Sequence, residues 1–128
     1  MREWPKATAV DDLGLTLGGV TELLDAESLV SGDPKTPVRA IGAADLMSDV
    51  LALGRPGMLL LTGLATAQAV RTASVADLAA IVFVRDKPVS DDVLALARES
   101  RVPVLRTRLT MFEASGRLYA AVEDRRAT

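Results

Sequence analysis

The sequence predicts an α/β fold built around a parallel sheet, and residues 79–105 carry the prediction. Residues 79–84 are apolar without a break, which is typical of a strand in the middle of a sheet covered on both faces. A polar loop follows, then an amphipathic helix that opens at Ser90, then a second β-rich run at residues 102–105. Strand, helix and strand in this order form a βαβ unit, whose two strands run parallel.

The chain before this unit is expected to begin with a short helix and two marginal strands. Residues 1–15 mix charges with proline and glycine without a period, so they predict a flexible lead-in. From Leu17 the apolar residues recur at helical spacing, and Thr16 is a suitable N-cap. Two short polar strands, 28–31 and 38–41, then flank a turn and suit the margins of a sheet.

The second helix is expected at residues 43–53, ended by Gly54. Its core face is expected to consist of Leu46, Met47, Val50 and Leu51. Asp45 and Asp49 would then lie one turn apart on the other face. Such a pair could hold a hard cation, but no third oxygen ligand is identifiable, so the pattern favours a solvated face and no metal site.

A second fully apolar strand, residues 58–61, leads into a helix of small residues, 65–73. The alanines of this helix lie on several faces, so other elements can approach it closely from more than one side. We expect it either to be sandwiched within the fold or to pack on another subunit. Ser74 and Asp77 have the spacing of a capping box, which predicts a short turn before the strand at 79–84.

The last helix is expected to begin at Thr110, which has the capping-box spacing to Glu113. Five of its residues are expected to face the core, and the two rings among them to supply most of its aromatic contribution: Met111, Phe112, Leu118, Tyr119 and Val122. Residues 123–128 form a charged tail that should fray. The domain proper is therefore expected to span residues 16–122.

The composition excludes several classes of function. The chain has 128 residues, enough for one compact domain, and its 15 basic and 17 acidic residues give a net charge of −2. Without a basic block, and with only 3% aromatic residues, nucleic acid is not an expected partner. The absence of cysteine and histidine excludes thiol nucleophiles, imidazole bases and the common zinc sites. We expect a cytoplasmic protein without catalytic residues or a cofactor, and without a membrane segment, since its apolar runs are too short for a bilayer.

Three stretches, in order and in register, resemble the DRTGG domain family: residues 44–51, residues 78–92, and residues 102–119. The resemblance covers roughly residues 16–121. It implies a three-layer α/β/α sandwich with a mostly parallel central sheet, akin to the amino-terminal domain of HPr kinase. Members occur beside enzyme domains and as small free-standing proteins, which implies a regulatory or assembly role rather than catalysis. The name-giving Asp-Arg-Thr-Gly-Gly run is absent from this chain.

If the protein binds a ligand, the site is expected where the parallel strands end. Open α/β sheets bind ligands at the carboxyl ends of their strands. Eight residues are expected there: Thr62, Gly63, Thr66, Arg85, Lys87, Arg106, Thr107 and Arg108. Four cations beside hydroxyl groups could receive an anion such as a nucleotide phosphate, helped by the helix that begins near Ser90, although solvated loop charges are common on α/β domains.

Three functions remain open on the sequence. The favoured one is a non-catalytic regulatory or interaction module that forms a homodimer or docks to a partner enzyme, because its alanine-rich helix and few aromatic residues leave apolar surface uncovered. The second is a sensor that binds a nucleotide or another small anion at the strand ends. The third is an enzyme that uses Asp45 and Asp49 with a divalent ion, and it ranks last because neither a base nor a nucleophile can be named.

Overall fold

The computed structural model describes residues 13–127. Its elements are β1 (Leu15–Thr16), α1 (Leu17–Leu23), β2 (Glu27–Val30), β3 (Pro37–Val38), β4 (Ala40–Ala43), α2 (Met47–Leu53), β5 (Met58–Thr62), α3 (Ala67–Val75), β6 (Ala80–Phe83), α4 (Asp91–Glu99), β7 (Val104–Arg106) and α5 (Met111–Ala127). Residues 1–12 of the expected flexible lead-in, which spans residues 1–15, lie outside the described residues. Leu15 belongs to β1 and is buried.

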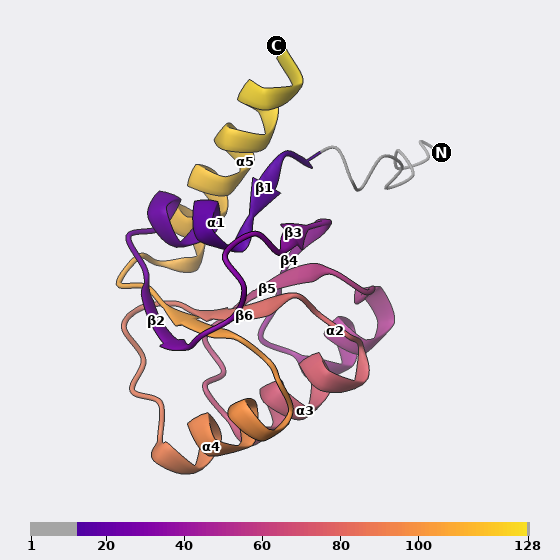
Figure 1. Ribbon diagram of the computed structural model, residues 1–128, viewed down its shortest axis with the longest axis vertical. Helices are drawn as coiled ribbons and strands as arrows, with labels where there is room; N and C mark the ends of the chain where they lie inside the picture. Colours follow the sequence, from indigo (N-terminus) through magenta and orange to yellow (C-terminus); the bar gives the residue numbers. More distant parts are fainter. Residues whose placement is uncertain (1–12, 128) are drawn as a thin grey trace.

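The central sheet has helices on both of its faces (Figure 1). Its five strands lie in the order β2-β7-β6-β5-β4. Strands β4 to β7 are parallel to one another, and only β2 runs antiparallel, at the edge beside β7. Strands β1 and β3 form a separate antiparallel pair. The α/β fold with a mostly parallel sheet is confirmed.

Two apolar cores, one on each face of the sheet, make the fold a three-layer sandwich. Alternate residues of β5 point to opposite cores: Leu60 packs beneath α2, α3 and α4, whereas Leu59 and Leu61 pack beneath α1 and α5. The same alternation continues in β6, where Ile81 belongs to the first core and Val82 to the second. A strand buried on both faces has to be apolar at every position, which explains the unbroken apolar runs.

The two short strands expected at the sheet margins do lie there, as β2 and β4. The second one is divided, because Val38 pairs with Leu15 in the separate ribbon while Ala40 begins β4. Between them the Arg39 N–H donates to the Gly57 carbonyl oxygen at 2.9 Å. The chain thus passes from the ribbon to the sheet within one residue.

The expected helix N-caps are confirmed. The hydroxyl of Thr16 accepts a hydrogen bond from the Gly19 N–H at 3.1 Å, and the hydroxyl of Ser90 accepts one from the Val93 N–H at 3.3 Å. At the start of α5 the Thr110 N–H donates to the Glu113 carboxylate at 3.0 Å. This bond, together with one from the Thr110 hydroxyl, lowers the pKa of Glu113.

The helix expected at residues 43–53 begins only at Met47. Ala43 is instead the last residue of β4, where it pairs with Leu61 of β5. Of the expected core face, Met47 and Val50 are buried, but Leu46 and Leu51 are more than half exposed. The strand pairing overrides the local helical pattern, since Ala43 pairs with Leu61 and the Ala44 N–H donates to the Leu61 carbonyl oxygen at 3.1 Å.

The alanine-rich helix α3 is sandwiched within the fold, because it packs between α2 and α4 and buries Ala69 and Ala73. The capping box expected at Ser74 and Asp77 is wrong. Ser74 lies inside α3, and Asp77 follows the end of the helix with a left-handed φ of 56°. The pair therefore ends a helix instead of opening one.

The aromatic residues of the last helix do not enter the core, which corrects another expectation. Phe112 is 87% and Tyr119 is 69% exposed, while α5 buries Ala114, Leu118 and Val122. The one aromatic side chain fully buried among residues 13–127 is Phe83, in β6. Helix α5 also extends to Ala127, through the residues expected to fray.

Candidate functional site

The loops after the parallel strands form one edge of the sheet, which we call the carboxyl edge. Thr62 pairs with Phe83, and Phe83 pairs with Arg106, so β5, β6 and β7 end level with one another. The Arg85 N–H donates to the Leu109 carbonyl oxygen at 2.8 Å, which joins the loop after β6 to the loop after β7. The structure thus brings the loops that carry the predicted site residues to one edge.

Asp45, which sequence reasoning assigned to a solvated helix face, is part of the carboxyl edge. It precedes α2 and does not share a helical face with Asp49. Its Oδ1 accepts hydrogen bonds from the Gly63 N–H at 2.7 Å and from the Thr62 hydroxyl at 3.1 Å. The carboxylate therefore takes the backbone donor that an incoming anion would use. The available signal was its position two residues after the end of β4, on the same edge as the other strand ends.

Arg85 extends its guanidinium over Gly63. A Cβ on Gly63 would lie 2.9 Å from the Arg85 Nη2, so a side chain there would displace the arginine. Arg85 and Asp86 both have left-handed φ values, 63° and 52°, and the Asp86 N–H donates to the Thr107 carbonyl oxygen at 2.9 Å. These backbone bonds fix the turn that carries Arg85.

Three of the other predicted residues already have partners within the protein. Arg106 pairs with Glu27 at 2.7 Å and with Asp86 at 3.6 Å. The hydroxyl of Thr107 is buried and donates to the Leu24 carbonyl oxygen at 2.8 Å. Thr66 is the N-cap of α3. Two remaining cations, Lys87 and Arg108, make no ion pair or side-chain hydrogen bond with any residue of the described range 13–127.

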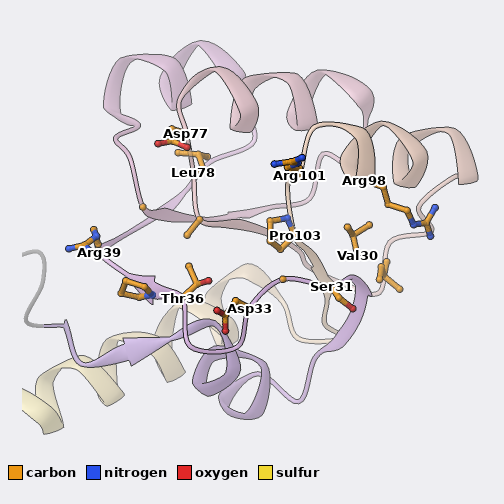
Figure 2. A pocket seen from close by; sticks show the side chains of 15 residues that line it. Val30, Ser31, Asp33, Thr36, Arg39, Asp77, Leu78, Arg98, Arg101 and Pro103 are labelled. Atoms are coloured by element: carbon orange, nitrogen blue, oxygen red, sulfur yellow. The ribbon is translucent and has the colours of Figure 1, made fainter.

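The opposite edge of the sheet carries a cleft of about 890 Å³, which we call the amino-edge cleft (Figure 2). Its walls are the loop of residues 31–37, the segments that lead into β4, β5, β6 and β7, and the end of α4. Five charged residues line it: Asp33, Arg39, Asp77, Arg98 and Arg101. Sequence reasoning placed no ligand at this edge.

Two of these charged residues occupy matching turns. Asp77 follows α3 and Arg101 follows α4, each with a left-handed φ, 56° and 58°. In each turn the N–H of the next residue donates to a carbonyl oxygen in the last turn of the helix. The Leu78 N–H donates to the Ala73 carbonyl oxygen at 3.0 Å, and the Val102 N–H donates to the Ala97 carbonyl oxygen at 2.9 Å. Glycine usually fills this position. Because neither turn contains glycine, the sequence carries no signal that these two residues are held in this conformation.

No set of three acidic residues within residues 13–127 comes close enough together to hold a metal ion. In the same range no helix combines the length and the apolar character that crossing a membrane would require.

Comparisons with known proteins agree with the architecture. The model of the DRTGG domain family matches residues 19–121. The crystal structure of the CBS and DRTGG domains of the regulatory region of Clostridium perfringens pyrophosphatase, complexed with its activator diadenosine tetraphosphate, is similar to this chain with a TM-score of 0.74 at 15% identity. The match covers 94% of this chain and 53% of that one, so the protein spans about half its length. At this identity the similarity shows the fold alone. No curated protein matches the sequence.

Proposed function

Because the chain belongs to the DRTGG domain family, we propose that it is a non-catalytic regulatory module that acts by associating with a second copy of itself. The solved structure with the same fold belongs to the regulatory region of an enzyme, which supports a regulatory role. The observation that carries self-association is the position of the exposed apolar side chains, which gather around one edge of the sheet.

Among residues 13–127, the large apolar side chains that are exposed are Leu46, Leu51, Leu53, Val75, Phe112 and Tyr119. The first three lie on α2 or just before it, in the connection that leaves β4, and Val75 ends the neighbouring helix α3. The last two lie on α5, where they line a groove with β4. These side chains therefore flank β4 on both faces of the sheet, and grouped apolar surface of this kind is typical of a protein interface.

The groove between β4 and α5 has a volume of about 620 Å³ and is lined by Ile41 and Ala43 of β4 and by Phe112, Gly116 and Tyr119 of α5, among others. Strand β4 is an edge strand, with β5 as its one partner in the described sheet. An open edge beside an apolar groove favours pairing with another strand. In a twofold dimer each copy would offer the other the same edge strand and the same aromatic residues, which satisfies the symmetry of a self-complementary interface.

The types of side chain in the sequence support a non-catalytic role. The chain has neither histidine nor cysteine, so a general base near neutral pH would have to be a strongly perturbed carboxylate or lysine. Asp45, a carboxylate of the carboxyl edge, is engaged with Thr62 and Gly63. We therefore assign Asp45 a structural role at the carboxyl edge.

The molar mass in solution tests self-association. We expect light scattering coupled to size-exclusion chromatography to give twice the chain mass of 13.5 kDa at micromolar concentration. A mass of one chain across the micromolar range would refute the dimer, and the same apolar surface would then be open to a partner enzyme.

A sensor of small anions is the second candidate function. The structurally similar regulatory region was solved with a nucleotide activator bound, which favours a ligand of this chemistry. At the carboxyl edge Arg85, Lys87 and Arg108 have no carboxylate within ion-pair distance among residues 13–127. Cations in this state can receive a phosphate group. These three cations belong to the site predicted from the sequence, together with Thr62, Gly63, Thr66, Arg106 and Thr107.

Thermal unfolding tests the carboxyl edge as the ligand site. A ligand that binds only the folded state raises the melting temperature. If the edge binds a nucleotide, at least one adenine or guanine nucleotide should raise the melting temperature, and Arg85→Ala and Lys87→Ala should each remove the rise. Arg71→Ala, at an exposed position of α3, is the matched control and should keep it. A rise that survives both edge variants would contradict this location.

A further inference from the structure

We propose that the amino-edge cleft is a binding site for a phosphate ester with a hydroxylated body, the chemistry of a nucleotide. In this site Arg98 and Arg101 bind the phosphate, and Asp33 and Asp77 accept hydrogen bonds from hydroxyl or amino groups. The inference does not depend on self-association, and it competes with the carboxyl edge as the location of a ligand.

The size and construction of the cleft suit a small molecule. Its volume of about 890 Å³ lies within the range of ligand pockets, which hold about 300–1,000 Å³. Apolar side chains, including Leu78 and Pro103, line it beside the charged ones. Figure 2 shows Arg98 and Arg101 near the end of α4, Asp77 on the turn after α3, and Asp33 on the loop that forms the opposite wall. Asp33 therefore lies across the cleft from the two helix ends, which carry the arginines and Asp77.

The two arginines are available for an anion. Neither Arg98 nor Arg101 makes an ion pair or a side-chain hydrogen bond with any other residue in the described part of the chain. They are not needed to complete α4 either, because the Ser100 and Val102 backbone N–H groups already donate to the last carbonyls of the helix, at 2.9 Å each. Guanidinium groups bind phosphate through paired, charge-assisted hydrogen bonds, and two of them three residues apart can share one polyphosphate.

The backbone at Arg101 is a second and independent observation. Arg101 holds a left-handed φ of 58°, which is unfavourable for a residue with a long side chain and costs nothing for glycine. The turn after α4 would therefore form more easily with glycine, so the fold does not account for an arginine here. A strained position that carries a charged side chain into a cleft is typical of a functional residue.

The carboxylates complement the arginines. Asp33 uses Oδ1 to accept from the Lys35 N–H at 2.9 Å. Its second oxygen is not used by that bond. Asp77 also has a left-handed φ and lies at the other side of the cleft from Arg98 (Figure 2). Because carboxylates repel phosphate, two of them in the same cleft favour a ligand whose phosphate end stays beside the arginines and whose remainder donates hydrogen bonds to the carboxylates.

The decisive variant is Arg101→Gly, measured with ATP and with tripolyphosphate at millimolar concentration. Removing one guanidinium should weaken ATP binding about tenfold or more, and relieving the left-handed arginine should raise the melting temperature of the ligand-free protein by about 3 °C. Loss of binding with a gain of stability cannot come from damage to the fold. Arg98→Ala should weaken ATP binding to a similar extent.

The matched control is Asp25→Gly. Asp25 holds the same left-handed position after α1, with a φ of 48°, and does not line the cleft. The Asp25→Gly substitution should also raise the melting temperature of the ligand-free protein, and it should leave ATP binding unchanged. Asp77→Asn should weaken the binding of ATP but not that of tripolyphosphate, since only ATP carries hydroxyl and amino groups.

Three results would overturn the inference. One is the absence of any melting shift with ATP or tripolyphosphate in the unaltered chain, and another is undiminished ATP binding in both arginine variants. The third is loss of the shift in Arg85→Ala with retention in Arg101→Gly, which would place the ligand at the carboxyl edge instead.

Discussion

We expect Phe112→Asp to convert the proposed dimer to a monomer without unfolding the chain. Phe112 is 87% exposed in the single chain, so the substitution removes little packing within it. In the proposed dimer the same ring fills the groove beside Ile41, and a carboxylate buried there would have no partner. Buried aromatic residues at the centre of an interface each contribute about 2 kcal/mol or more, so the dimer dissociation constant should rise at least about 30-fold.

The control for this substitution lies on the same helix. Ala120 is exposed on α5 but does not line the groove with β4. Ala120→Asp introduces the same charge and should leave the dimer intact, whereas Tyr119→Asp should separate it as Phe112→Asp does. Sedimentation equilibrium across the micromolar range measures all three. If Phe112→Asp and the unaltered chain have the same dissociation constant, the interface lies elsewhere.

The parts of the fold that could be predicted are those that local chemistry decides. The strands around Leu60 and Ile81 are buried on both faces, so each reads as an unbroken apolar run whatever its neighbours are. The N-caps at Thr16 and Ser90 depend on residues only three positions apart. Elements of both kinds carry their own signal in the sequence.

The parts that could not be predicted depend on distant partners. The start of α2 at Met47 follows from the pairing of β4 with β5, which the sequence around Ala43 does not reveal. Similarly, six residues at 100° each place Phe112 and Leu118 about 120° apart around α5, so the helix cannot turn both of them directly toward the core. Only the packing against the sheet shows that Leu118 is the buried one.

The same distinction applies to the candidate sites. Thr62 and Arg85 could be placed at the carboxyl edge because each follows an apolar strand directly. The hydrogen bonds from Thr62 and Gly63 to Asp45 could not be predicted, because they join loops 17 and 18 residues apart in sequence. The place of Arg101 in the cleft could not be predicted, because it depends on a left-handed turn, and that conformation has no sequence signal when glycine is missing.

Phe83→Ala will destabilise the chain more than the corresponding change at any exposed aromatic residue. Phe83 is fully buried in the core beneath α2, α3 and α4, where it stands between Thr62 and Arg106 on the neighbouring strands. Removing a buried phenylalanine ring costs about 3–5 kcal/mol, because the transfer free energy is lost and a cavity remains. For a domain of this size the melting temperature should fall by roughly 10–20 °C.

The matched comparison is Phe112→Ala, with both variants made in the Tyr119→Asp background so that association does not contribute to the measured stability. Urea unfolding should then give a free-energy loss of about 3–5 kcal/mol for Phe83→Ala and about 0.5 kcal/mol or less for Phe112→Ala. The difference arises because the ring of Phe112 contacts mainly water in the single chain, while that of Phe83 contacts none. Equal losses at the two positions would mean that α5 packs its aromatic face into the core, as the sequence pattern first suggested.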